Sequence, residues 1–554
     1  MPESGETKRV RQPLSLVGLI LGTLFFAFSL TPSLVPRPAG AQGVLSGLSL
    51  AAGYALGLAA LGLWRHLQLP GVPSRAARLA TASTALVCLL VAGSFLWKAS
   101  AWQDAILALM GMEAPASPLR RLFLVGAITL VVFLLILGLA RLFRRVFHAL
   151  SARLHPHVPE RVARLLGLAV AAALFWGVID GVLVRFALRV ADRSFQELDA
   201  LVEDELSRPS GAGKTGSAGS WVDWEDLGRQ GRRFVSGGPT GEDLSRFFGG
   251  ARPAPIRVYV GLGCADTAEQ RARLALRELV RVGGFERGLL VVATPTGTGW
   301  VDPAAIDTLE YLQRGDVATV AAQYSYLNSP LALLTQGAYG VEMSRALFAE
   351  VYRHWRSLPA DARPRLFLHG LSLGALNSDL SFDLYDIIDQ PFDGALWSGP
   401  PFRSETWRQV TAQRDPGSPA WRPTFRGGSV VRFMNQGPHP EPANRDWGAF
   451  RMLFLQYASD PITFFSFESA WREPEWMRAP RGPDVSPDLR WFPVVTMLQL
   501  AADMAFGSAP PGFGHEFAPA DYIDAWVALT EPEGWTEADL ERLRSLFRPP
   551  PAAD

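Results

Sequence analysis

The first third of the chain is dominated by long apolar stretches. Four of them run for 19 or more residues without a charge, and a fifth contains a single charge, Asp180. A helix needs roughly 20 apolar residues to cross a bilayer, and soluble helices rarely stay uncharged for so long. The pattern therefore predicts five transmembrane helices: Leu14–Val35, Val44–Trp64, Leu79–Trp97, Leu122–Ala140 and Leu165–Val184.

Basic residues between these stretches predict how the bundle is oriented. Twelve Lys and Arg flank one side of the expected bundle and four flank the other. Because cytoplasmic flanks are enriched in Lys and Arg, the richer side is predicted to face the cytoplasm. With five crossings, everything after about residue 190 is then expected outside the cytoplasm. An acid inside a span is costly, so Asp180 is expected to face the bundle or a partner. A structural pair with Arg185 is favoured, and a polar pathway or lipid-headgroup site is the alternative.

After residue 190 the pattern becomes polar and then changes period. Residues 191–255 are predicted to be a connector, with an amphipathic helix at Phe186–Leu206 followed by a Gly- and Pro-rich stretch. From Ile256 onward, short β-branched runs alternate with segments of helical period. The expected strands are 256–260, 288–294, 316–322, 365–369, 394–397, 429–433 and 453–457.

Such alternation indicates a doubly wound α/β domain with a mostly parallel sheet. The sequence thus divides into a multi-pass domain (1–190), a connector (191–255) and a domain at 256–554 that we expect to be catalytic.

Composition limits the chemistry that this chain can perform. The 53 basic and 53 acidic residues balance, but residues 1–190 hold 18 basic and six acidic ones, so no basic soluble domain exists to bind nucleic acid. The two cysteines, Cys88 and Cys264, exclude a disulfide scaffold and a cysteine-based metal site. No cofactor or metal motif is present, so neither is expected.

The sharpest chemical motif is Gly370-Leu371-Ser372-Leu373-Gly374. It follows an expected strand and precedes an expected helix. This is the context of a nucleophile elbow, in which a tight turn lifts a serine off the sheet between two small residues. Ser372 is therefore the candidate nucleophile.

A catalytic serine needs a base and an acid that orients the base, and on this sheet they follow the serine in the order acid, then histidine. Two histidines follow Ser372. His515 lies in a glycine-rich loop near the C-terminus and is favoured over His439, which lies in a Pro-His-Pro turn. Asp460 comes directly after the last expected strand and is the candidate acid.

Acyl transfer also requires donors to the oxyanion. One is expected to be the backbone amide of Leu373, the residue after the nucleophile. The others are expected in the loop 294–300 after the second strand, at Thr296 and Gly297, where small residues let the backbone approach a substrate.

The chain resembles a bacterial membrane-anchored α/β-hydrolase family, whose members join a multi-spanning N-terminal domain to a C-terminal α/β-hydrolase domain. One departure is Leu371, where the family has Glu before the serine. The resemblance covers nearly the whole chain and implies the fold and the site, but no substrate. It rests on Trp224–Gly231, Thr294–Pro303, Gln323–Leu327, the motif at Ser372, Asp393–Pro401, Ser459–Pro461 and Gly514–His515.

Together these features predict a membrane-anchored serine hydrolase of the esterase or lipase type. Its expected substrates are membrane lipids or other esters of the cell envelope. Two alternatives stay open: an acyltransferase that uses the same triad, and a non-catalytic transport or assembly component with a hydrolase-like binding domain. Fold alone does not decide between them.

Overall fold

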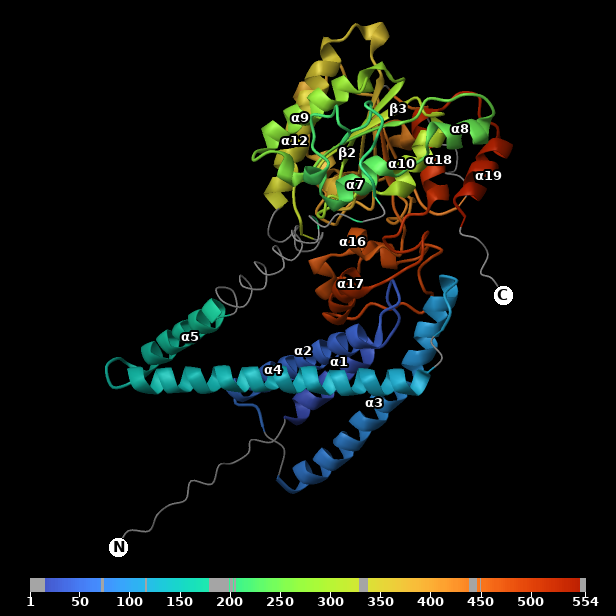
Figure 1. The fold of residues 1–554 in the computed structure, drawn as a ribbon. Helices are drawn as coiled ribbons and strands as arrows, with labels where there is room; N and C mark the ends of the chain where they lie inside the picture. The colour runs from blue at the N-terminus through green and yellow to red at the C-terminus, as the bar shows by residue number, and fades with distance from the viewer. Residues whose placement is uncertain are drawn as a thin grey trace. The chain divides into compact units, whose positions relative to one another are not determined.

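The chain folds into two compact units in the computed structural model (Figure 1). The helical unit contains the chain up to Gly177 together with Ser466–Met477 and Ser486–Ser508. The hydrolase unit contains Val178–Phe465, Arg478–Val485 and Ala509–Asp554. The structure describes residues 15–70, 74–114, 117–178, 199, 203, 206–327, 337–437, 446–448 and 450–548.

In the part of the chain that the structure describes, the helical unit has five N-terminal α-helices and a sixth α-helix that comes from far along the chain. The sixth, α17 (Val495–Phe506), packs on α1 and α2. The N-terminal helices are α1 (Leu16–Ser29), α2 (Ala39–His66), α3 (Ser74–Leu109), α4 (Pro118–Leu154) and α5 (Glu160–Trp176).

Three described helices are long and apolar enough to cross a membrane: α2, α4 and the part of α3 at Ala82–Leu109. They correspond to the second, third and fourth predicted spans. The first predicted span forms the 14-residue helix α1, which is shorter than a crossing requires. The helix stops at Ser29 because Pro32, Pro36 and Pro38 follow it and proline cannot continue a helix.

The fifth predicted span begins in the 17-residue helix α5 and runs on past the described residues. Asp180, Arg185 and most of the predicted amphipathic helix also lie outside the described residues. The number of crossings, and with it the orientation, stays a prediction.

Glycines let the N-terminal helices approach closely. A Cβ atom on Gly53 of α2 would lie 2.4 Å from the carbonyl oxygen of Leu21 in α1, and one on Gly57 would lie 2.6 Å from Gly18 Cα. Small residues four apart are typical of helix contacts within membranes, where close backbone packing replaces the hydrophobic effect.

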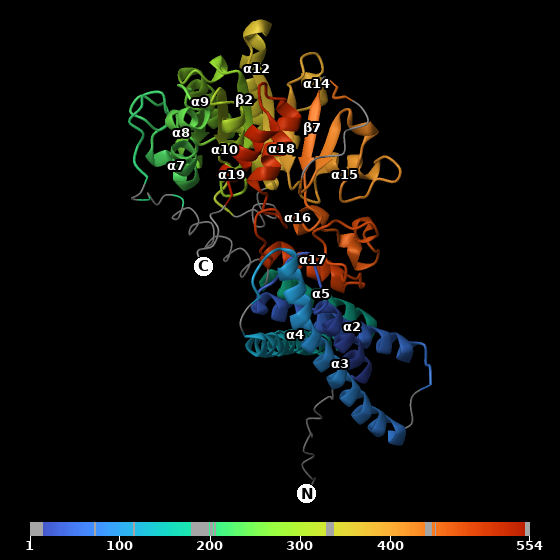
Figure 2. The same ribbon diagram turned by 90° about the vertical axis from the view of Figure 1, so that its right-hand side faces the viewer.

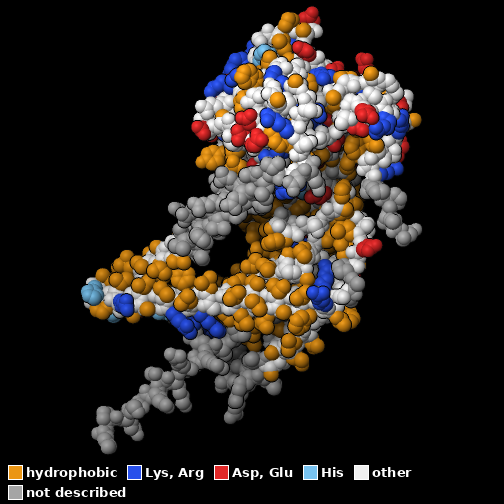
Figure 3. Space-filling model, viewed as in Figure 1, with side chains coloured by type: hydrophobic (Ala, Val, Ile, Leu, Met, Phe, Trp, Pro, Cys, Tyr) orange, Lys and Arg blue, Asp and Glu red, His pale blue; other side chains and the backbone are white. Residues whose placement is uncertain are grey.

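Large apolar side chains cover the outside of the helical unit (Figure 3). Leu89 is 70% exposed, Leu135 67% and Phe123 74%. An apolar surface of this extent is unfavourable in water and matches a lipid environment. The surface of the hydrolase unit instead carries mixed basic and acidic side chains (Figure 3).

A seven-stranded parallel sheet forms the centre of the hydrolase unit, with the strand order β1-β3-β2-β4-β5-β7-β6. Every predicted strand is present, with ends shifted by a few residues at most. The strands are β1 (Ile256–Val260), β2 (Leu289–Thr294), β3 (Val317–Ala322), β4 (Arg365–Leu371), β5 (Gly394–Ser398), β6 (Val431–Met434) and β7 (Arg451–Leu455).

Helices cover both faces of this sheet, as its apolar strands require. The helices α9 (Ala268–Arg281) and α12 (Gly337–Ser357) pack together and contact β3. On the opposite face lie α10 (Pro303–Leu312) and α18 (Pro519–Thr530), and α18 contacts β5 and β7 (Figures 1 and 2). Among the described residues, the other α-helices of the unit are α7 (Gly228–Ser236), α8 (Gly241–Phe248), α13 (Leu373–Asp379), α14 (Leu384–Ile387), α15 (Glu405–Ala412), α16 (Pro461–Phe464) and α19 (Glu537–Leu546).

Candidate active site

Ser372 occupies a sharp turn between β4 and α13. Its backbone has φ of 57° and ψ of −122°, a conformation that costs free energy for a residue with a side chain and that clusters at functional sites. A Cβ on Gly370 would lie 2.3 Å from the carbonyl carbon of Gly374, and one on Gly374 would lie 2.2 Å from the carbonyl oxygen of Thr294. The two glycines of the motif are therefore required by close backbone contacts.

The predicted acid and base meet in the structure. Asp460 follows β7 and caps α16, because its Oδ1 accepts the Ile462 amide at 2.8 Å. Its Oδ2 lies 2.7 Å from His515 Nδ1 and also accepts the Thr463 hydroxyl at 3.0 Å. The Asp460 side chain is fully buried and that of His515 is 20% exposed.

The bond to Asp460 fixes the imidazole tautomer. With its proton on Nδ1, a neutral His515 presents a lone pair on Nε2. That nitrogen is buried and has no hydrogen-bond partner among the described residues, so it is not bonded to Ser372 in this structure. Catalytic hydrogen bonds are often long in a free enzyme and tighten when substrate binds.

The turn after β5 brings the serine and the histidine to one place. The Ser372 amide donates to the Ser398 carbonyl at 2.9 Å. In the next residue, Gly399, an added Cβ would lie 2.4 Å from His515 Cε1. Both candidate residues therefore contact adjacent positions at the carboxyl end of the sheet, Ser398 at the end of β5 and Gly399 after it.

Two opposing effects act on the His515 imidazole. Burial lowers its pKa, but the charge and hydrogen bond of Asp460, together with the charges of Glu516 and Asp302, raise it by more, so the pKa of His515 lies above 6.5. Burial also raises the pKa of the nearby Asp302 carboxyl to about 6. By contrast, burial lowers the pKa of His369 to about 4, and its Nδ1 contacts the Leu396 carbonyl at 3.0 Å, as a structural strand residue would.

The loop expected to bind an oxyanion lies against the turn at Ser372, since Gly374 contacts Thr294. The amide of Thr296 donates to the Trp300 carbonyl at 2.9 Å, so it is occupied and is not available to a substrate. Among the described residues, the amides of Gly297 and Leu373 make no such bond. This arrangement favours Gly297 and Leu373 as donors over Thr296.

Sequence reasoning did not find the residues that hold the acid and base loops together. Ser459 Oγ accepts the Gly514 amide at 2.8 Å, which joins the loop before Asp460 to the loop before His515. The Ser459 amide in turn donates to Asp484 Oδ2 at 2.8 Å. No periodicity marks these positions. The alternative base, His439, lies outside the described residues.

No group of three or more His, Cys, Asp or Glu side chains that could hold a metal ion occurs in the described part of the chain. The arrangement is instead that of a nucleophile elbow beside an acid–histidine pair on a doubly wound parallel sheet. This combination defines a hydrolase-like α/β protein. The chain belongs to the alpha/beta-hydrolase family: the model of that family matches residues 256–543, and the model of the N-terminus of the same family matches residues 30–239. No curated protein and no solved structure gave a significant match.

Proposed function

We propose that the protein is a membrane-anchored serine hydrolase that cleaves esters. Ser372 Oγ attacks the carbonyl carbon of the ester while His515 Nε2 takes its proton, and the alcohol leaves with that proton. Water then attacks the acyl-enzyme by the same route and releases the acid. The pairing of His515 with the buried Asp460 beside the strained Ser372 is the observation that supports this proposal.

We base the proposed class of substrate on the membrane helices of the chain. A chain with three helices able to cross a membrane keeps its hydrolase unit close to lipid, so we propose membrane lipids or other envelope esters as substrates. The excess of Lys and Arg on one side of the five predicted spans supports a hydrolase unit outside the cytoplasm. An acyltransferase with the same triad differs only in the acceptor, so product analysis with and without an added alcohol separates the two.

A fluorophosphonate probe tests the proposal directly, because it reacts with activated serines. Membranes that contain the full chain are treated with the probe and digested, and the labelled peptide is identified by mass spectrometry. We expect a single labelled peptide, the one that contains Ser372. No label on folded protein would contradict the hydrolase and favour a binding domain; a label on another serine would place the nucleophile elsewhere.

The rate of labelling should depend on pH through His515. The base must be neutral to accept the serine proton, and its folded-state pKa is raised above 6.5. The rate is therefore expected to fall as the pH drops through a midpoint above 6.5 and to be retained at alkaline pH. Labelling rates measured from pH 5 to 9 check this. A midpoint below 6.5 would contradict the bond between Asp460 and His515.

A further inference from the structure

The chain between the candidate acid and base leaves the hydrolase unit and joins the helical unit. We call residues 466–508 the tether. Ser466 follows Asp460 by six residues, and His515 follows Ser508 by seven. Two pieces of the tether, Ser466–Met477 and Ser486–Ser508, belong to the helical unit, while Arg478–Val485 belongs to the hydrolase unit. The acid and the base thus bracket a segment attached to the membrane helices.

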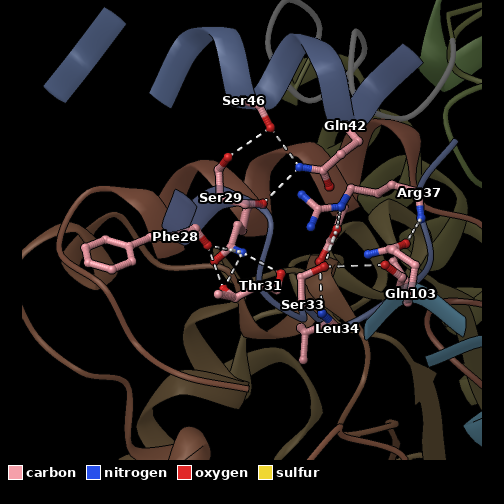
Figure 4. A network of polar contacts seen from close by, with 12 residues as sticks. Phe28, Ser29, Thr31, Ser33, Leu34, Arg37, Gln42, Ser46 and Gln103 are labelled. Atoms are coloured by element: carbon pink, nitrogen blue, oxygen red, sulfur yellow. Dashed lines mark hydrogen bonds and ion pairs between the residues drawn. The ribbon is translucent and has the colours of Figure 1, made fainter. Parts of the chain in front are cut away.

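Asp503 in α17 makes the central attachment to the turn between α1 and α2. Figure 4 labels Ser33, Leu34 and Arg37 of this turn. Asp503 Oδ1 lies 3.0 Å from Arg37 Nε, and both side chains are fully buried. Oδ1 also accepts the Ser33 hydroxyl at 3.0 Å, and Oδ2 accepts the Leu34 amide at 3.0 Å. The Asp503 carboxylate therefore contacts three residues of the turn between α1 and α2.

Further contacts fasten the tether to the same part of the helical unit. Gln499 Nε2 donates to the Thr31 carbonyl at 3.1 Å. The rings of Phe28 and Phe492 stack with their centroids 4.0 Å apart. A Cβ on Gly507 would lie 2.3 Å from Val35 Cγ2. Residues 492–507 of the tether thus contact the end of α1 and the turn after it, by polar and apolar contacts alike.

The ion pair is unusual because little else compensates the arginine. The two terminal nitrogens of Arg37 have no hydrogen-bond partner among the described residues. Removing one partner of a buried pair leaves an uncompensated charge, whereas replacing both by apolar residues is often neutral. We therefore expect the Arg37–Asp503 pair to contribute more to the position of α17 than to the free energy of unfolding.

The middle of the tether, Arg478–Val485, belongs to the hydrolase unit and contacts the residue before the acid. Asp484 Oδ2 accepts the amide of Ser459, the residue before Asp460. The Pro480 carbonyl accepts the Trp421 indole N–H at 2.9 Å. Because Ser459 Oγ also accepts the Gly514 amide, the position of the tether bears on both the acid loop and the histidine loop.

We propose that the tether holds Asp460 and His515 in their working geometry from the membrane helices, with Asp503 as the positioning residue in the helical unit and Asp484 as that in the hydrolase unit. The inference rests on the proposed function and adds to it a requirement: the hydrolase unit works fully only while the tether is docked on the turn between α1 and α2. This gives a physical reason for joining the two units in one chain.

The variant Asp503→Asn in the full chain, reconstituted in nanodiscs, tests the proposal. It keeps the size of the side chain but removes the charge opposite Arg37. We expect the labelling rate, measured on the fraction of protein that takes the probe, to fall by about tenfold, because small displacements of catalytic groups have large effects on rate. We also expect the acid midpoint to move down toward 6.5, since a displaced Asp460 supports the His515 pKa less. The double variant Arg37→Met with Asp503→Asn, which leaves no charge at this pair and keeps a side-chain oxygen that can accept the Leu34 amide, should restore both.

A second readout does not depend on activity. Hydrogen exchange of the peptide covering residues 509–517 reports the bond from the Gly514 amide to Ser459. Exchange there should quicken in Asp503→Asn. It should stay unchanged in the control Asp104→Asn, which removes a half-exposed partner of Arg121 at 3.9 Å in the same unit.

Two results would contradict the proposal that the tether positions Asp460 and His515. One is a smaller labelled fraction with unchanged rate and midpoint; the other is unchanged exchange at 509–517. If the wild-type protein takes no label, the proposed hydrolase fails, and the exchange measurement alone still decides whether the tether positions the loop.

Discussion

Replacing Ser372 with alanine is expected to abolish fluorophosphonate labelling and to lower any ester hydrolysis by at least about 10⁴-fold, as loss of a serine nucleophile does in enzymes of this mechanism. The physical reason is that the oxygen lost belongs to the serine that the strained turn after β4 presents, next to the loop that carries His515. The loss should not come from unfolding. Alanine has nearly the same volume, and the backbone of residue 372 is held by Gly370, Gly374 and the Ser398 carbonyl.

The control is Ser381→Ala, another buried serine of the same region. Its hydroxyl donates to the Ser378 carbonyl at 2.7 Å, and it lies outside the turn. This variant should lose stability by about 1 kcal/mol, as for an ordinary hydrogen bond, and keep its label. Thermal unfolding and labelling are measured on both variants. A folded Ser372→Ala protein that still takes the probe would disprove the assignment of the nucleophile.

The sheet and its elbow could be predicted because both depend on local patterns. Strands buried on two faces give short β-branched runs such as Leu289–Thr294, and Gly370 of the Gly-X-Ser-X-Gly motif closely approaches the backbone of Gly374, four residues further on. Family membership agrees with this interpretation of the fold. The candidates Asp460 and His515 were found by chain order, and the structure places them in contact, although no comparison tests their roles.

What the sequence did not reveal depends on distant contacts. Asp503 looks like any acid on a helix, and its partner Arg37 lies 466 positions away in a proline-rich turn. The apolar pattern of Leu14–Val35 likewise extended past the real end of α1, since hydropathy does not register that Pro32 stops a helix. Nor does residue size in the loop 294–300 show that the Thr296 amide is bonded to Trp300.

The variant Asp460→Asn is expected to lower the labelling rate by about 10³–10⁴-fold while leaving the fold intact. Asparagine keeps Oδ1, so the cap on the Ile462 amide at 2.8 Å survives. Its amide group, however, would donate to His515 Nδ1, which would move the imidazole proton to Nε2. A protonated Nε2 has no lone pair for the serine proton, and the wrong tautomer is known to be this costly in serine enzymes.

The matched control is Thr463→Val, which removes the other side-chain donor to Asp460 Oδ2 but leaves the carboxylate charge and the bond to His515. Its rate should fall by no more than about a hundredfold, since one hydrogen bond to a charged group contributes roughly 1.5–3 kcal/mol. Labelling rates of both variants are measured at pH 8, and thermal unfolding checks that both are folded. The comparison decides whether Asp460 orients His515. Both variants keep the cap on the Ile462 amide, and only Asp460→Asn changes the tautomer of His515. If both lose labelling rate equally and modestly, Asp460 acts by capping α16 and does not orient the base.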